Sequence, residues 1–593
     1  MATLMSEATR QDREHDTPSL SDALIFRAKA TLLQVKRAAL NLSTSSIARF
    51  QTSERLAGSA VVAQSRTPLW TNNDEHEKHL LAGKVHNLRL AIRRLDGVEI
   101  PASAIFSFWA QVGQASRWKG YVAGRELREG CIIPAIGGGL CQLSNALYDA
   151  ALKAGFEIVE RHAHTRALPG SLAEVGRDAT VFWNYVDLRF KSSRAFRIEA
   201  MMDADFLTVR FRSGLQRDAE QAEGEPERSA RGVVQVAPQS CFTCAALDCF
   251  RHVERKPDAK GFGRAAYLVD DYYPEFDDYI RRTRRERDLL AVPLDGKRFG
   301  KRNYAWSTQG FQQVRQSWAN TMLRAYRSRR LAEQGAVRQR ALLSSSERLA
   351  RGYARLLKYD VGQVTVMQNL LPFLWRDGYL GGRTFDVLMT TLPLARLHQR
   401  LDMAAALHPE SRPLADFRAD ERLVRAELAA LEQARRIITP HTEVAALYAD
   451  KAVLVDWAMP PKKLAYKRGN GARVIFPAAT VGRKGAYELR AAVRGLDLQL
   501  ITLGAQLEGT DFWRGLPVEN RVGDASWLEG ASVVVLPAFV EHRPRRLLEA
   551  VACGVPVIAS TACGLENVEG VINIPIGDAK ALREQLERVI SEY

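Results

Sequence analysis

Cysteine and long hydrophobic runs are both scarce in this chain. Its 593 residues include only 7 cysteines, an odd number that does not suggest a disulfide framework. The longest apolar run, at 531–540, contains Ser532 and Pro537 and is far shorter than the roughly 20 residues that a bilayer-spanning helix needs. The N-terminal segment 1–19 is polar and lacks the basic start and apolar centre of a secretory signal. We therefore expect a cytoplasmic protein, in a reducing compartment.

Negative charge is also in deficit. The chain has 84 Lys and Arg against 68 Asp and Glu, a net charge of +16, which favours anionic partners. No nucleic-acid-binding motif and no basic block interleaved with aromatic residues is present, so we expect no nucleic-acid partner. The segment 21–42 sets Leu24, Leu32 and Val35 among basic residues at helical spacing. It predicts an amphipathic helix that either docks on the protein or places the chain at an anionic membrane surface, peripheral to the inner membrane.

The order of elements predicts a multidomain α/β protein. From about 446 to 590, strands and helices alternate regularly, which is typical of a parallel sheet with crossover helices, whereas 262–445 is largely helical with short strands. We predict an N-terminal α+β domain and a C-terminal Rossmann-like lobe, and a resemblance given below implies a second such lobe before it. The expected segments are a polar tail with a basic helix (1–54), the α+β domain (55–212), a charged linker (213–232), a Cys/His segment (233–261), a first lobe (262–445) and a second lobe (446–593).

The stretch AIGGGLCQLSNALYDAALKAG places one cysteine between glycines and a helical pattern. Gly137, Gly138 and Gly139 permit a tight backbone approach, and apolar residues then recur at helical spacing until Gly155. Cys141 is therefore predicted at or near a helix N-terminus, where the helix dipole favours a thiolate.

Histidines and aspartates follow this cysteine. FEIVERHAH reads as an alternating strand that carries His162 and His164 on one face, and the next segment supplies Asp178 and Asp187. A cysteine at a helix start with a histidine and a carboxylate is the arrangement of papain-like and transglutaminase-like nucleophilic sites. The alternative is an inert, buried Cys141. The residues do not select one histidine or one aspartate.

A family resemblance covers this region. HNLRLAIRRLDGVEIPASAIFSFWAQVG, GYVAGRELREG, IGGGLCQLSNALYDAALKAGFEIVERHAHT and GRDATVFWNYVDLRF follow one another within about residues 65–200. Together they closely resemble the VanW-like domain, which is found beside vancomycin-resistance and cell-envelope genes. The resemblance implies peptidoglycan or another bacterial envelope polymer as the context. The Cys/His/Asp site does not come from the family and remains an inference from the residues.

The string CFTCAALDCFRH gathers four soft metal ligands within twelve residues. The pattern C-x2-C-x4-C-x2-H suits a structural tetrahedral zinc, with an iron–sulfur cluster as the second candidate and a metal-free turn as the third. The four ligands would be Cys241, Cys244, Cys249 and His252.

Two strings near the C-terminus predict a nucleotide-sugar site. In ARVIFPAATVGRKGAYELRAAVRGL, Arg483 and Lys484 stand in a loop before a helix, where they would bind a diphosphate or remain as solvated charges. In VVVLPAFVEHRPRRLLEAVACGVPVIASTACG, Glu541 and Glu549 form an E-x7-E pair in a strand–loop–helix–strand frame. This frame closely resembles the nucleotide-sugar-binding half of retaining glycosyltransferases with the GT-B fold.

The resemblance implies a role for each of these residues. Glu549 matches the residue that holds the donor ribose, Glu541 the one near the donor sugar, and Lys484 the lysine that neutralises the diphosphate, with Arg483 beside it. Two features depart from the family pattern: the two cations are adjacent rather than separated, and the segment 542–544 replaces a small, Gly-rich loop. An unusual donor-sugar pocket is therefore expected, and an inactive fold of this type is the alternative.

The GT-B fold also implies a first lobe that binds the acceptor, with Gln368 and His441 lining the cleft. The leading hypothesis is a glycosyltransferase that uses a nucleotide-sugar donor on a glycan or lipid-linked acceptor of the cell envelope. The alternative is a cysteine-dependent amidase or acyl transferase in the VanW-like domain, with the glycosyltransferase-like half as a sugar-binding module.

Overall fold

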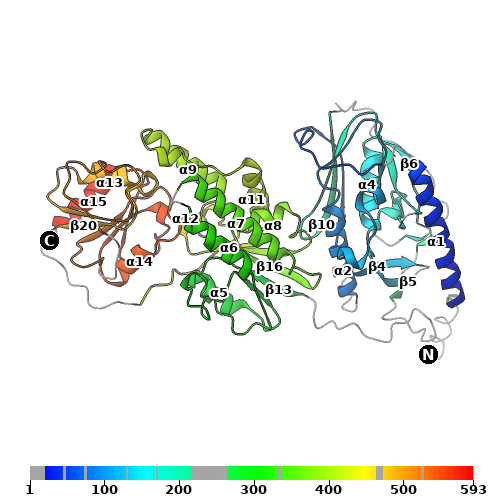
Figure 1. Cartoon of the computed structure of the whole chain (residues 1–593), viewed down its shortest axis with the longest axis horizontal. Helices are drawn as coiled ribbons and strands as arrows, with labels where there is room; N and C mark the ends of the chain where they lie inside the picture. Colours follow the sequence, from blue (N-terminus) through cyan, green and yellow to red (C-terminus); the bar gives the residue numbers. More distant parts are fainter. Residues whose placement is uncertain are drawn as a thin grey trace, which may run out of the picture. The chain divides into compact units, whose positions relative to one another are not determined.

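The computed structural model divides into two compact units (Figure 1). The first consists of Met1–Gly263, Lys358–Gly362 and Gly378–Arg383, and the second of Arg264–Leu357, Gln363–Asp377 and Thr384–Tyr593. The residues that the structure describes are 20–43, 48–71, 77–128, 131–164, 166–167, 171–183, 185–214, 234–235, 239–240, 263–331, 335–461, 472–521 and 527–591.

The first unit is built around a four-stranded antiparallel sheet in the order β1-β10-β9-β2. Helix α4 packs against β1 and β10, and alternation along β9 and β10 buries one face of each strand. A cluster of phenylalanine rings, which includes a stacked pair of Phe156 and Phe211 at 5.2 Å between centroids, fills the core beneath α4. The sheet strands are β1 (Val61–Pro68), β2 (Val98–Ile100), β9 (Phe196–Met202) and β10 (Phe206–Ser213).

Three smaller sheets complete this unit: β3-β8-β6, β12-β5-β4 and β11-β7. Their strands are β3 (Phe106–Ser107), β4 (Ala123–Arg128), β5 (Cys131–Ile136), β6 (Glu157–Glu160), β7 (Arg166–Ala167), β8 (Arg189–Lys191), β11 (Val234–Gln235) and β12 (Gln239–Ser240). The α-helices are α1 (Leu20–Ser43), α2 (Lys78–Ile92), α3 (Phe108–Val112) and α4 (Cys141–Lys153).

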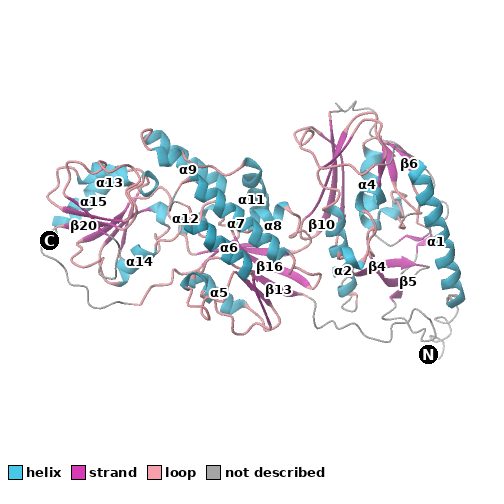
Figure 2. Ribbon diagram, in the orientation of Figure 1, coloured by secondary structure: helices cyan, strands magenta, loops and turns pink. Residues whose placement is uncertain are grey.

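A seven-stranded sheet in the order β15-β14-β13-β16-β17-β18-β19 forms the first lobe. The pairs β13·β14, β14·β15, β16·β17, β17·β18 and β18·β19 are parallel. Figure 2 shows α5 on one side of this sheet and α6, α7 and α8 on the other. The strands are β13 (Arg264–Leu268), β14 (Leu289–Val292), β15 (Gln313–Gln316), β16 (Val361–Met367), β17 (Thr384–Leu388), β18 (Arg436–Thr439) and β19 (Ala452–Leu454). The helices are α5 (Pro274–Thr283), α6 (Trp318–Arg329), α7 (Ala336–Ala354), α8 (Leu371–Arg376), α9 (Leu394–Leu407), α10 (Arg412–Ala415), α11 (Glu421–Gln433) and α12 (Thr442–Leu447).

The second lobe is a six-stranded parallel sheet in the order β22-β21-β20-β23-β24-β25. Counted within the lobe, this order is 3-2-1-4-5-6, the doubly wound order of dinucleotide-binding sheets. The order in which strands are added to the sheet reverses between β20 and β23. Sheets of this type bind ligands at the point of reversal. The elements are β20 (Arg473–Phe476), α13 (Ala486–Val493), β21 (Gln499–Leu503), β22 (Val518–Arg521), β23 (Val533–Leu536), α14 (Arg545–Ala552), β24 (Val557–Ser560), β25 (Val571–Ile574) and α15 (Ala579–Ser591).

The predicted fold class is confirmed: antiparallel α+β structure comes first, and two parallel-sheet lobes follow. One local prediction is wrong. Strand β6 ends at Glu160, so His162 and His164 lie in irregular backbone beyond it rather than on one face of a strand. The predicted segment boundaries stay predictions. Among the residues that the structure describes, no helix is both long and apolar enough to cross a membrane.

Candidate functional sites

The loop before α4 fixes the position of Cys141 in the first unit. Gly139 has a φ of 97°, and a Cβ at this position would lie 2.0 Å from Cγ of Lys84 on α2. The side-chain amide of Asn87, one turn further along α2, donates a hydrogen bond to the carbonyl oxygen of Gly138 at 3.0 Å. A glycine is therefore required where this loop meets α2. The loop delivers Cys141 as the first residue of α4, as the sequence predicted.

His164 and Asp178 come together beside Cys141. Asp178 is 1% exposed, and its Oδ2 lies 2.5 Å from Nδ1 of His164 and accepts the His164 backbone N–H at 2.6 Å. Arg161 donates to Oδ1 of the same carboxylate at 2.9 Å. Burial lowers the pKa of His164, but hydrogen bonds to Asp178 and to the Cys141 thiol outweigh burial and raise it to about 10. Burial raises the pKa of Asp178, but its hydrogen bonds to His164 leave it below its usual range.

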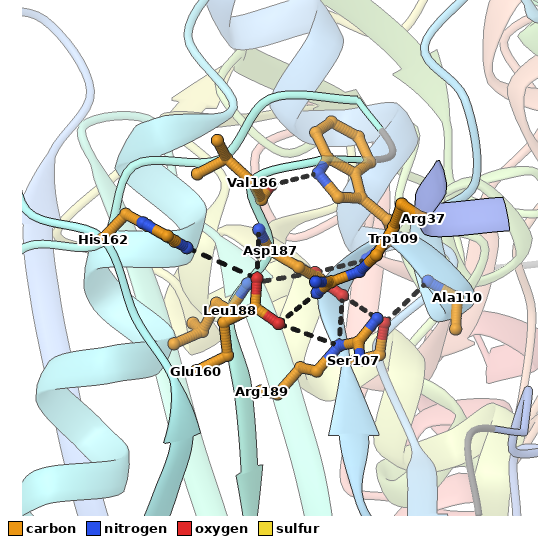
Figure 3. Close-up of polar contacts among 10 residues, drawn as sticks. All are labelled: Arg37, Ser107, Trp109, Ala110, Glu160, His162, Val186, Asp187, Leu188 and Arg189. Atoms are coloured by element: carbon orange, nitrogen blue, oxygen red, sulfur yellow. Dashed lines mark hydrogen bonds and ion pairs between the residues drawn. The ribbon is translucent and has the colours of Figure 1, made fainter. Parts of the chain in front are cut away.

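His162 and Asp187 belong to a neighbouring cluster instead (Figure 3). Asp187 accepts hydrogen bonds from the Ser107 hydroxyl at 2.6 Å and from Nε of Arg189 at 2.9 Å. His162 has a half-exposed side chain and lies 3.4 Å from Glu160, which also pairs with Arg189. These ion pairs and hydrogen bonds join β6, β8 and the start of α3. The cluster therefore connects structural elements and has no role at the Cys141 thiol. The structure thus selects His164 over His162 and Asp178 over Asp187.

A glycine also positions the first cation of the second site. Gly485 has a φ of 77°, and a Cβ there would fall 2.0 Å from the carbonyl oxygen of Pro537. The short turn Gly482–Lys484 can therefore lie directly against the end of β23. The backbone carbonyl of Arg483 accepts the N–H of Phe539, which ties the two loops together at the switch point of the sheet.

Lys484 and Glu541 form a mostly buried ion pair at this point. Nζ of Lys484 lies 2.7 Å from Oε2 of Glu541 and donates to the Val540 carbonyl at 3.1 Å. Oε1 of Glu541 accepts the backbone N–H groups of His542 and Arg543 at 2.9 and 2.8 Å. Burial raises the pKa of Glu541, but the charge of Lys484 and these hydrogen bonds outweigh it and lower it to about 2.

The cavity at the ends of β20 and β23 has a volume of about 370 Å³. Among the described residues that line it, Glu541 supplies the single carboxylate. The cations that line it are Arg483, Lys484, Arg543, Arg545 and Arg546. Burial lowers the pKa of His542 to about 4. The charges of Lys484 and Arg483 act in the same direction, and the charge of Glu541 opposes them. The cavity is therefore strongly complementary to an anion.

Sequence reasoning missed three of these cations. Arg543 donates to the Tyr272 carbonyl at 2.9 Å and lies over the Tyr273 ring, and Arg545 pairs with the buried Glu275. These contacts join the two lobes of the second unit. The run EHRPRR was a signal that could have identified them, because it follows a strand end at the switch point. Among the described residues, Glu549 is not part of the cavity lining. It lies on α14, where its charge acts on Arg546.

The two residues expected to line the acceptor cleft bind different partners. His441 is buried where the lobes meet, and its Nε2 lies 3.2 Å from the Glu541 carbonyl oxygen. Gln368 instead donates to Oε1 of the buried Glu427 at 3.0 Å and to the Leu392 carbonyl. His441 thus lies beside the loop after β23, and Gln368 makes hydrogen bonds within the first lobe.

A polar network that the sequence did not predict lies at the switch point of the first lobe. Asp270 follows β13 and is 1% exposed. Its two carboxylate oxygens bind Arg324 at 2.6 Å and Asn369 at 2.7 Å. Burial raises the pKa of Asp270, which the charge of Arg324 opposes. The pair of aspartates directly after the strand AAYLV was the available signal.

The proposed metal ligands Cys241, Cys244, Cys249 and His252 lie outside the described residues. Within the described ranges, no group of three or more His, Cys, Asp or Glu side chains is arranged to hold a metal ion.

Comparison with protein families identifies two segments. A family described as VanW like protein matches residues 83–212, and one described as Glycosyl transferases group 1 matches residues 488–592. The first match confirms the VanW-like resemblance of the N-terminal domain. The second covers the cationic loop after β23 and all of α14.

Curated relatives match the same two parts. The uncharacterized protein YoaR of Bacillus subtilis is 38% identical over 107 residues, which are 18% of this chain and 35% of that protein. The vancomycin B-type resistance protein VanW of Enterococcus faecalis is 32% identical over 127 residues, 21% of this chain and 46% of that protein. A D-inositol 3-phosphate glycosyltransferase of Pseudarthrobacter chlorophenolicus is 34% identical over 106 residues, 17% of this chain and 25% of that protein. The chain spans less than half the length of each of these relatives.

Solved structures resemble the chain more weakly. A sucrose-phosphate synthase from Thermosynechococcus elongatus is 16% identical with a TM-score of 0.37, covering 56% of this chain and 90% of that chain. Anabaena HepE in complex with UDP-glucose is 14% identical with a TM-score of 0.33 and the same coverage.

Proposed function

We propose that the protein is a glycosyltransferase that binds a nucleotide-diphosphate sugar in the cavity at the ends of β20 and β23. The observation that carries this proposal is the lining of that cavity, where five cations surround a single carboxylate among the described residues. The doubly wound strand order places the cavity where such sheets bind nucleotides. The family match at 488–592 supports glycosyl transfer as the chemistry.

The cations would act on the leaving group. When the bond between the sugar and the diphosphate breaks, negative charge develops on the diphosphate, and fixed positive charges in a poorly hydrated cavity stabilise it. Lys484 and Arg483 lie on the turn before α13, and Arg543, Arg545 and Arg546 lie at the start of α14. The diphosphate would therefore be held from two loops at once.

Glu541 would act on the sugar as a carboxylate. With a pKa of about 2 it is ionised at neutral pH, so it does not serve as a proton donor. It can accept hydrogen bonds from sugar hydroxyls and stabilise positive charge that develops at the anomeric carbon. The E-x7-E frame resembles that of retaining enzymes, and retention of configuration is part of the proposal.

The proposed acceptor is a glycan or lipid-linked precursor of the bacterial cell envelope, on the cytoplasmic side of the inner membrane. The relative VanW is named a vancomycin resistance protein, which supports an envelope context, peptidoglycan included. The N-terminal helix offers a second argument for a membrane surface. On α1, Leu24, Leu32 and Val35 are 66%, 70% and 64% exposed, whereas Ala30 is buried on the other side of the helix.

The first experiment is a thermal-shift panel of nucleoside diphosphates and nucleotide sugars. We expect one nucleotide series to raise the melting temperature, because a ligand at a hundredfold excess over Kd adds about 2.7 kcal/mol to the free energy of unfolding. The double variant Lys484→Ala/Glu541→Gln removes the ion pair without leaving a buried unpaired charge, and it should lose most of the shift. Lys580→Ala, an exposed lysine of α15 in the same lobe, is the matched control.

Two results would contradict the proposal. One is the absence of a shift with every nucleotide tested. The other is an equal shift in the double variant and the control. Release of labelled nucleoside diphosphate from the donor that binds, followed by chromatography of the sugar product, then separates a transferase from a module that only binds nucleotide sugars.

A further inference from the structure

We propose that Cys141, His164 and Asp178 form a second catalytic centre, in which the Cys141 sulfur attacks the carbonyl carbon of an amide or ester and carries the acyl group as a thioester. This inference lies in the first unit and does not rest on the proposed glycosyl transfer. It would give the VanW-like domain a chemistry of its own.

The thiol is placed for reaction. Cys141 is partly exposed and is the first residue of the 13-residue helix α4. In general, the N-terminus of a helix favours negative charge, and reactive cysteines are found at such positions. Ser144 and Asn145, on the first turns of the same helix, bind Ala179 at 2.6 and 2.8 Å, which holds the start of the helix against the segment that carries Asp178.

The imidazole is placed by the carboxylate. Asp178 occupies Nδ1 of His164, which leaves Nε2 for a reacting thiol. Cys141 lies close enough to raise the pKa of His164, and its Sγ lies 3.9 Å from the Val181 carbonyl oxygen. Asp178 is held in turn by Arg161 and by the His164 backbone N–H. Asp178 and Arg161 are thus positioning residues, and the two reacting groups are Cys141 and His164. An inert buried thiol would not require a histidine whose orientation is set by a carboxylate.

The proposed cycle consumes the acyl substrate and a water or an acceptor amine, and it returns Cys141 and His164 to their starting state. The thiolate attacks the carbonyl carbon, and the C=O electron pair moves to oxygen. The tetrahedral species collapses, the bond from carbon to nitrogen or oxygen breaks, and the His164 imidazolium gives its proton to the departing amine or alcohol. A water or an acceptor amine then attacks the thioester and gives its proton to His164. The thiolate departs, and the thiolate–imidazolium pair is restored.

The test compares cysteines within one intact protein. Alkylation by iodoacetamide at pH 6 is followed by peptide mass spectrometry for Cys141 and for Cys553. Cys553 is also partly exposed but sits at the C-cap of α14, where the helix dipole disfavours a thiolate. We expect Cys141 to react faster than Cys553 by on the order of tenfold or more. His164→Ala should remove this advantage, whereas His162→Ala, the matched control, should keep it.

A second readout tests acyl transfer itself. Incubation with p-nitrophenyl acetate should release one equivalent of nitrophenolate in a burst and leave a hydroxylamine-sensitive acetyl group on Cys141. Cys141→Ser should abolish the burst, and Asp178→Asn should move the pH profile of alkylation toward that of Cys553. Equal reactivity of Cys141 and Cys553, or an unchanged rate in His164→Ala, overturns the proposal. Fast alkylation without a thioester overturns it as well, and would assign the thiolate to redox chemistry.

Discussion

Two glutamates of the second unit, Glu541 and the buried Glu427, show how local partners decide the ionisation of a residue. Glu541 lies beside Lys484, and its pKa is lowered from an ordinary value of 4.5 to about 2. Its pair therefore stabilises the fold above about pH 4.5, and this contribution is lost as the pH falls through about 2. Among the described residues, burial and two hydrogen bonds, rather than a cation, set the pKa of Glu427. Burial raises its pKa to about 7, and hydrogen bonds from the Leu394 N–H and from Gln368 oppose this shift.

The raised pKa of Glu427 predicts a loss of stability with rising pH. Between about pH 4.5 and 7 the folded chain holds a proton that the unfolded chain has released, so the free energy of unfolding falls across this window, by roughly 3 kcal/mol. Urea titrations at pH 5 and 7.5 should show this difference in the wild type, and Glu427→Gln should reduce it. Glu432→Gln, at an exposed position of the same helix α11, should leave it unchanged. If the free energy of unfolding changes equally between the two pH values in the wild type and in Glu427→Gln, the assignment is wrong.

At the scale of elements, the turn between β20 and α13 depends on a close approach of two backbones. Gly485 and Gly495 both have a φ of 77°, but a Cβ on Gly485 would meet the Pro537 carbonyl oxygen at 2.0 Å, whereas nothing lies within 4 Å of one on Gly495. The two positions therefore share the same backbone strain and differ in packing.

We expect Gly495→Ala to cost about 1–2 kcal/mol of stability, the cost of a left-handed backbone for alanine. Gly485→Ala should cost a further 1–3 kcal/mol or so, because the new methyl group pushes α13 away from β23. The same variant should weaken nucleotide binding, since Lys484 precedes this glycine. Denaturant melts and the thermal-shift panel measure both effects. Similar costs for the two variants would show that the approach of the loops is not tight.

The apolar side of helix α1 faces solvent, whereas a helix that docks on its own protein buries its leucines. Leu24, Leu32 and Val35 fall within roughly a quarter of the helix circumference at 3.6 residues per turn. Exposed Lys29 and Lys36 border this stripe. On the opposite side, Arg37 binds Glu160 at the end of β6. An apolar stripe bordered by lysines fits the surface of an anionic bilayer.

The wild-type protein should therefore sediment with vesicles that contain phosphatidylglycerol and bind purely zwitterionic vesicles more weakly. Leu24→Ser/Leu32→Ser/Val35→Ser should reduce binding by about tenfold or more, because three apolar side chains no longer enter the interface. Leu407→Ser, at an exposed position of α9, is the control. Equal binding of the triple variant would exclude this helix as the contact. Lipid-free dimerisation that the triple variant abolishes would assign the stripe to a second copy of the chain.

At the scale of the whole molecule, the two candidate sites belong to different compact units. The thiol site is assembled from α4 and the segments that follow it, whereas the cationic cavity is assembled from loops of the second lobe and touches residues of the first lobe. Each site therefore has its own set of local contacts. Sites that share no partners contribute nearly additively to stability and binding.

This division predicts independent behaviour of the two sites. Cys141→Ser should leave the nucleotide-induced thermal shift unchanged, and Lys484→Ala/Glu541→Gln should leave the alkylation rate of Cys141 unchanged. The two variants combined should show the sum of the single effects. A change of Cys141 reactivity when nucleotide binds would show instead that the units communicate.

Local patterns of residues were sufficient to predict several elements of this fold. Glycine spacing and helical periodicity placed Cys141 at the start of α4, and regular alternation of strands and helices predicted the parallel second lobe, whereas the first lobe was implied by the GT-B resemblance. The E-x7-E frame located the loop after β23, because a loop after a buried strand at this position must lie at the carboxyl edge of the sheet. Each of these depends on residues that are close in the chain.

The choice of contacting side chains depends on how the folded segments pack against one another. His164 rather than His162 reaches the thiol because β6 ends at Glu160, so that strand periodicity no longer sets the direction of either histidine. Arg543 lines the cationic cavity, where Tyr272 and Tyr273 of the other lobe hold it. Gln368 donates a hydrogen bond to the buried Glu427. The partners of Gln368 and Arg543 lie 59 and 271 residues away, and Asp178 lies 14 residues from His164. The spacing of residues along the chain does not show which of these pairs will meet.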